Sequence, residues 1–71
     1  MSLSARNQLP GTVEQVKEGA VMAEVVVRLD GGPMIVSVIT LESARRLQLV
    51  AGSQVRVVVK ATDVMVMTAE A

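Results

Sequence analysis

The sequence predicts an all-β fold, a small barrel of five short strands with one short helix between the third and fourth strands. Half of the 71 residues are hydrophobic (51%) and none is aromatic, so aliphatic side chains have to fill the core. Valine recurs among them, and its branched side chain packs well on a pleated sheet. Turn signals that contain glycine separate the valine-rich runs. We expect one domain over residues 1–71, with an ordered core at about 3–68.

The first three strands are predicted by the alternation of side chains over residues 11–17, 20–29 and 34–39. In the second of these runs, small and branched apolar residues fall on one face, as in a strand that buries that face. The Asp-Gly-Gly triplet at 30–32 separates the second run from the third. Glycine supplies the positive φ that a tight hairpin requires, so these two strands are expected to pair.

A short helix is predicted after the third strand. Thr40 can cap its first turn, and Glu42 lies where the helix dipole favours an anion. Arg45 and Arg46 fall in its last turn, and the helix is expected to stop near Leu49. Two further strands follow, at 54–60 and 63–67. This order of elements is typical of a five-stranded OB-type barrel.

Composition excludes several classes of function. The chain has no Cys and no His, so the usual ligands of zinc, iron and copper are absent, as are cysteine nucleophiles and His-based triads. Its net charge is zero and it has no aromatic side chain on which bases could stack, which disfavours nucleic acid. Glu14 and Glu18 would lie about 13 Å apart along a strand, too far for a glycosidase pair. No run is long enough to span a membrane. We therefore expect a cytoplasmic protein that is not an enzyme.

Three polar clusters remain, and each alone has an ordinary structural explanation: a loose terminus, a helix cap, an edge lysine. Together they offer hydroxyls, backbone N–H groups and two cations, the groups that bind a small tetrahedral oxyanion. Because they are mainly donors, such a site would favour an anion that carries no proton. The clusters comprise Ser4, Ala5 and Arg6; Thr40 and Ser43; and Lys60, Ala61 and Thr62.

Three segments of the sequence resemble the molbindins, the single-domain Mop proteins related to the TOBE domains of molybdate transporters and regulators. They read SARNQLPGTV (4–13), VSVITLESARRLQL (36–49) and VKATDVMV (59–66). The resemblance implies a cytoplasmic, non-catalytic protein that binds molybdate or tungstate for storage or homeostasis. It further implies a homohexamer, a trimer of dimers that exchange strands. The alternative is a TOBE-type sensor module of a transporter or regulator; the start at Met1 and the single Mop unit favour the free-standing protein.

The same resemblance places the oxyanion between subunits. The motif positions are the three clusters above, with Thr40 and Ser43 supplied by another copy of the chain. A second oxyanion site, known in some members of the family, would involve the main chain of Gly19, Ala20, Val21 and Met22.

Overall fold

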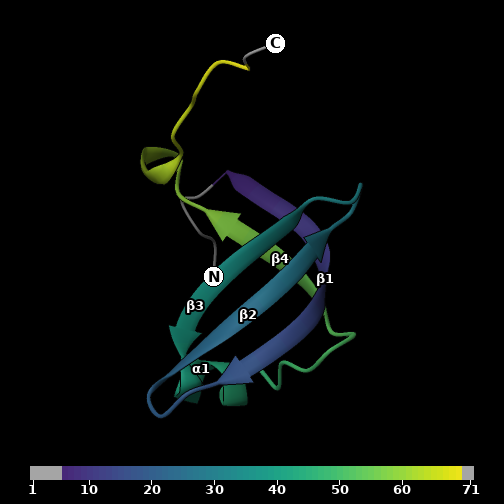
Figure 1. Ribbon diagram of the computed structural model, residues 1–71, viewed down its shortest axis with the longest axis vertical. Helices are drawn as coiled ribbons and strands as arrows, with labels where there is room; N and C mark the ends of the chain where they lie inside the picture. Colours follow the sequence, from purple (N-terminus) through teal and green to yellow (C-terminus); the bar gives the residue numbers. More distant parts are fainter. Residues whose placement is uncertain (1–5, 70–71) are drawn as a thin grey trace.

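The molecule is built on one antiparallel sheet of four strands in the order β3-β2-β1-β4, with one short helix after β3 (Figure 1). The computed structural model describes residues 6–69. Its elements are β1 (Asn7–Glu18), β2 (Met22–Leu29), β3 (Met34–Thr40), α1 (Leu41–Arg46), β4 (Gln54–Val59) and a 3-10 helix, η1 (Ala61–Asp63). The all-β prediction is confirmed. Strand β1 begins at Asn7 rather than at residue 11, because its first residues pair with β4.

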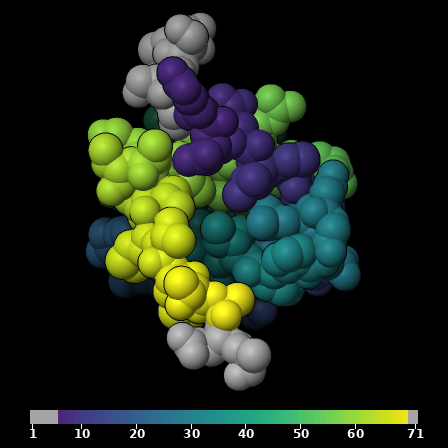
Figure 2. Space-filling model, turned by 90° about the horizontal axis from the view of Figure 1, so that it is seen from above, coloured from purple at the N-terminus to yellow at the C-terminus, as the bar shows by residue number. Residues whose placement is uncertain are grey.

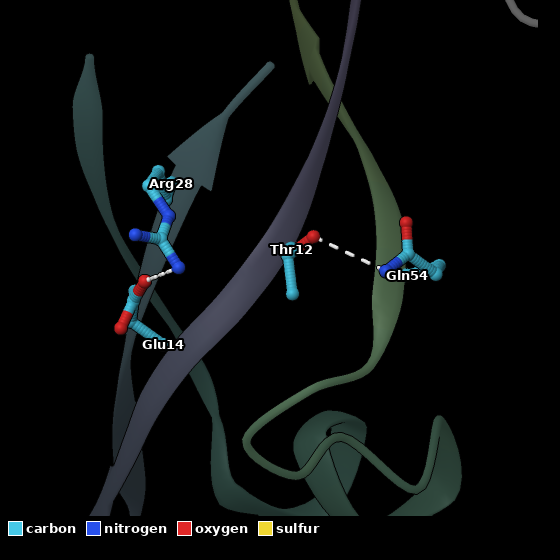
Figure 3. Close-up of polar contacts among 4 residues, drawn as sticks. All are labelled: Thr12, Glu14, Arg28 and Gln54. Atoms are coloured by element: carbon cyan, nitrogen blue, oxygen red, sulfur yellow. Dashed lines mark hydrogen bonds and ion pairs between the residues drawn. The ribbon is translucent and has the colours of Figure 1, made fainter. Parts of the chain in front are cut away.

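Strand β1 changes register at Glu14. Its pairing with β2 shifts between Val13 and Gln15, which leaves Glu14 as an extra residue on the β1 side. Such a bulge increases the local twist of a strand. The Glu14 carboxylate forms an ion pair with the Arg28 guanidinium on β2 (Figure 3). The bulge therefore helps to curl the sheet around its concave face.

Strand β1 lies between β2 and β4 and pairs with both. Gly11 is one of the residues that take part in both pairings. A Cβ placed on Gly11 would lie 2.7 Å from the backbone oxygen of Arg28, so only glycine lets β2 come this close. On the β4 side, the Gln54 amide donates to the Thr12 hydroxyl at 3.2 Å (Figure 3).

The core lies on the concave face of the curled sheet. Its centre is Val13, Val25 and Val27, each at most 3% exposed. Between the two edge strands the core stays open, as a hollow of about 250 Å³. Residues of both edges line it, among them Ser37 and Ile39 of β3 and Val55 and Val57 of β4. The four strands therefore form a curled sheet with a gap between β3 and β4.

Helix α1 begins as predicted but ends earlier. Thr40 is its N-cap, as expected from the sequence. The helix ends at Arg46 instead of continuing to Leu49, because Gln48 adopts a left-handed conformation (φ 55°). The Leu49 N–H then donates back to the Ala44 carbonyl at 3.1 Å, which closes the helix end. No helix among the described residues is long and apolar enough to cross a bilayer.

The segment expected as a fifth strand does not pair with the sheet. Residues 61–63 form η1, and residues 64–69 have no regular secondary structure. This segment leads away from the sheet in Figure 1, and Met65, Val66 and Met67 are each more than 90% exposed. A strand requires a neighbour for its N–H and C=O groups. Within residues 6–69, the place beside β3 and β4 is unfilled.

Candidate functional site

Arg6, the described residue of the first predicted cluster, lies at the same end of the sheet as the third cluster. Arg6 directly precedes β1, and Lys60 directly follows β4. The last pair of the β1–β4 ladder is Asn7 with Val59, so the same register sets Arg6 opposite Lys60 one position further on. Figure 2 looks down on this end and shows the start of β1 (purple) beside the end of β4 and the segment after it (green to yellow). Antiparallel pairing thus joins residues that are 54 positions apart in the sequence.

The two cations at this end have no carboxylate partner within residues 6–69. Arg6 and Lys60 are both exposed. Ion pairs engage other arginines, Arg28 with Glu14 and Arg45 with Glu18. Like charges on facing positions of two strands repel each other. An anion bound between the Arg6 guanidinium and the Lys60 ammonium would remove this repulsion.

Helix η1 adds backbone donors beside Lys60. The Asp63 N–H donates to the Lys60 carbonyl at 2.9 Å, and the Val64 N–H donates to the Ala61 carbonyl at 3.3 Å. The N–H groups of Ala61 and Thr62 find no acceptor in the described part of the chain. With the Thr62 hydroxyl, they place three neutral donors next to the two cations.

The second cluster lies at the opposite end of the sheet. Thr40 ends β3 and caps α1, near the bottom of Figure 1, whereas β4 ends near the top. The Thr40 hydroxyl oxygen accepts from the Ser43 N–H at 3.1 Å, and the Thr40 and Ser43 hydroxyls are hydrogen-bonded to each other at 2.7 Å. One copy of the chain therefore brings Arg6, Lys60 and η1 together but keeps Thr40 and Ser43 apart from them. Ser4 and Ala5 lie outside the described residues.

The stretch predicted as a second site forms the turn between β1 and β2. The Gly19 N–H is already engaged, since it donates to the Met22 carbonyl at 2.8 Å. Ala20 and Val21 border an open hollow of about 690 Å³. Arg45 and Arg46 line the same hollow, a role that their place in the last turn of a helix did not reveal in the sequence. Arg45 is partly engaged there by Glu18, at 3.3 Å.

Fold and site together define a small antiparallel β module with one end rich in hydrogen-bond donors and positive charge. The TOBE domain family model matches residues 3–66, and the chain belongs to this family. Molybdenum-pterin-binding protein 2 of Clostridium pasteurianum is 49% identical to it over 67 residues, which cover 94% of this chain and 98% of that protein. The resemblance to Mop proteins seen in the sequence is thereby confirmed.

Solved structures agree with this assignment. A molybdate-binding protein from Sporomusa ovata has a TM-score of 0.91 and 40% identity, with 96% of this chain and 100% of that one covered. The cytoplasmic molybdate-binding protein ModG, solved with molybdate bound, has a TM-score of 0.82 and 59% identity. That match covers 86% of this chain and 43% of the ModG chain.

Proposed function

We propose that this protein binds molybdate or tungstate without transforming it, and serves molybdenum storage or homeostasis in the cytoplasm. The observation that carries the proposal is the pair Arg6 and Lys60, which face each other at the end of the β1–β4 ladder and have no carboxylate partner within residues 6–69. Two cations match a doubly charged oxyanion, and the guanidinium fork can donate to two of its oxygens. The relatives named molybdenum-pterin-binding and molybdate-binding proteins support this choice of ligand.

The site is completed by a second copy of the chain. Its first half consists of Ser4, Ala5, Arg6, Lys60, Ala61 and Thr62. Its second half consists of Thr40 and Ser43 of the neighbouring copy, since these two lie at the far end of the sheet in one copy. Binding between copies would also exclude water, which strengthens each charge-assisted hydrogen bond.

Exchange of the C-terminal segment joins the copies into dimers, three of which make a hexamer. Residues 64–67 alternate Val and Met, are at least 49% exposed and have no strand beside them in the described chain. The apolar hollow between β3 and β4 offers a place for such a strand. Inserting the segment of a second copy there would supply the fifth strand of the barrel. A core with so few fully buried side chains gains most from this exchange.

The outer face of β3 provides a further contact between copies. Met34, Val36 and Val38 follow each other at alternate positions on this edge strand and are 55–61% exposed. Thr40 is the next residue in the same alternation. If a neighbouring copy covered this apolar stripe, Thr40 would lie close to that copy. Assembly would then help to complete the site.

Donor chemistry favours an anion without a proton. Molybdate and tungstate are deprotonated near neutral pH, whereas phosphate keeps a proton over much of this range. A buried P–OH group would find few acceptors among the site groups, at a cost of about 1–3 kcal/mol for one poorly satisfied group. Sulfate lacks a proton, so only a cavity shaped for longer metal–oxygen bonds can discriminate against it.

The turn at Gly19, Ala20, Val21 and Met22 remains a candidate for a second oxyanion site. The N–H groups of Ala20 and Val21 have no acceptor within residues 6–69. Arg46 lines the same hollow and would supply the positive charge there.

Calorimetric titration of the purified protein tests the proposed function, together with elemental analysis for molybdenum and tungsten. We expect tight molybdate binding that tungstate displaces at comparable concentration, that sulfate displaces less well, and that phosphate hardly displaces. Absence of molybdate binding would refute the proposed ligand. Displacement of molybdate by equal phosphate would refute the donor-only site.

A further inference from the structure

Methionine is confined to the surface in the described part of the chain. The buried core consists of valine and alanine, whereas all four methionines within residues 6–69 are exposed. Met22 and Met34 on the sheet are 42% and 55% exposed, and Met65 and Met67 of the C-terminal segment are 94% and 92% exposed. Exposed thioethers are the ones that oxidants reach. The C-terminal pair therefore carries the two most accessible thioethers of the described chain.

The proposed exchange would move these two thioethers out of water. In an extended segment, Met65 and Met67 share one face, and Val64 and Val66 share the other. One face would enter the apolar hollow between β3 and β4. The other would continue the exposed apolar stripe of β3, which a further copy is proposed to cover. The two methionines would therefore be buried among apolar groups in either orientation.

A sulfoxide fits neither of these surroundings. Of the side chains that line the hollow, only Ser37 and Arg56 are polar, and the Arg56 guanidinium already donates to Gln8 at 3.2 Å. The apolar stripe of β3 offers no side-chain donor. Oxidation replaces the thioether by a polar S=O group. A buried acceptor without a donor weakens an association by roughly tenfold to a hundredfold.

We propose that Met65 and Met67 are oxidation sites through which a hydroperoxide opposes assembly and, with it, oxyanion binding. In each step the thioether sulfur attacks the hydroxyl oxygen of the peroxide; the O–O bond breaks and an S=O bond forms. Two electrons pass from sulfur to the peroxide, whose other oxygen leaves with the hydroxyl proton as an alcohol, or as water from hydrogen peroxide. Methionine sulfoxide reductases reverse the change. This inference rests on the proposed function, because a site shared between copies is lost when the copies separate.

Leucine variants isolate the C-terminal pair. Met22→Leu/Met34→Leu is the background, and adding Met65→Leu/Met67→Leu gives the resistant control, since leucine and methionine are similar in volume. Both proteins are oxidised with hydrogen peroxide in urea, freed of peroxide and urea, and refolded before molybdate is added. The oxidised background should form smaller species than its untreated form and bind molybdate at least about tenfold more weakly. The four-leucine protein should keep its size and affinity, and a methionine sulfoxide reductase should restore the background.

Peptide mass spectrometry verifies the oxidation, light scattering measures size, and calorimetry measures molybdate binding. An oxidised background that keeps the size and affinity of its untreated form would overturn the inference, as would an equal loss in the four-leucine protein. If the background does not refold, Met65→Gln/Met67→Gln and Met65→Leu/Met67→Leu are compared in the parent without oxidant. Only the glutamine pair, which carries a polar acceptor, should then separate the copies, and equal behaviour of the two variants would overturn the inference.

Failure of this inference is distinguishable from failure of the proposed function. If the untreated parent binds no molybdate or remains a single chain, the proposed function itself fails. If the parent assembles and binds molybdate while oxidation changes neither property, only the role given to Met65 and Met67 fails.

Discussion

Arg6 differs from the other arginines of the sheet in what surrounds it. Arg28 pairs with Glu14, and Arg56 donates to the Gln8 side chain at 3.2 Å. Arg6 stands opposite another cation and has no carboxylate partner within residues 6–69. Two facing cations do not stabilise the strand pair, and in the proposed site an oxyanion of opposite charge would neutralise them.

Replacement of Arg6 by alanine should weaken molybdate binding by about 1.5–3 kcal/mol, or roughly tenfold to a hundredfold, because a charged hydrogen bond is lost. Arg6→Lys should recover part of this loss, since a point charge cannot reproduce the fork. Arg56→Ala removes the same charge from the same sheet and is the matched control. Calorimetry that finds both alanine variants equal to the parent would remove Arg6 from the site.

Gly11 is the second residue whose replacement has a defined outcome. A Cβ there would lie 2.7 Å from the Arg28 backbone oxygen and 2.8 Å from a methyl group of Val27. Gly11→Ala should therefore force β1 and β2 apart and lower the free energy of unfolding by about 1–3 kcal/mol. Urea unfolding measures this change. A variant as stable as the parent would show that the two strands approach less closely than the structure has them.

At the scale of elements, the sequence predicted correctly the features that depend on residues close together in the chain. Alternating valines indicated the four observed strands, and the Asp-Gly-Gly turn and the Thr40 cap lie where expected. The helix end was placed too late because the left-handed Gln48 carries no glycine signal. The fifth strand could not be decided from residues 63–67 alone, since their pattern suits a strand but their pairing depends on a partner edge.

The apolar stripe on β3 leads to a prediction about assembly. Val36→Glu should place a charge in the proposed contact between copies and reduce the proposed hexamer to smaller species, while the concave core stays intact because Val36 is 58% exposed. Val50→Glu, at a 63% exposed valine outside the sheet, serves as the control. Light scattering with circular dichroism measures both properties. A folded hexamer of the Val36 variant would exclude the stripe as an interface.

At the scale of the whole molecule, the residues of the proposed site are divided between the two ends of the sheet. The sequence predicted the three clusters of the proposed site from their donors, because residue type alone determines what a side chain can donate. It could not show which clusters meet within one chain, since that depends on the β1–β4 register. The structure joins Arg6 with Lys60 and leaves Thr40 and Ser43 at the far end. Assembly is therefore the central claim of the proposed function.

Subunit mixing tests this claim most directly. Arg6→Ala and Ser43→Ala variants each damage a different half of the site, so each assembly alone should bind molybdate weakly. When the two are unfolded together and reassembled, about a quarter of the sites between copies should combine an intact Arg6 with an intact Ser43, as random pairing of a heterologous interface requires. Native mass spectrometry would verify the mixed assemblies, and calorimetry should show tight binding restored at about a quarter of the parent's stoichiometry. Mixed assemblies that bind no better than either variant alone would contradict a site shared between copies.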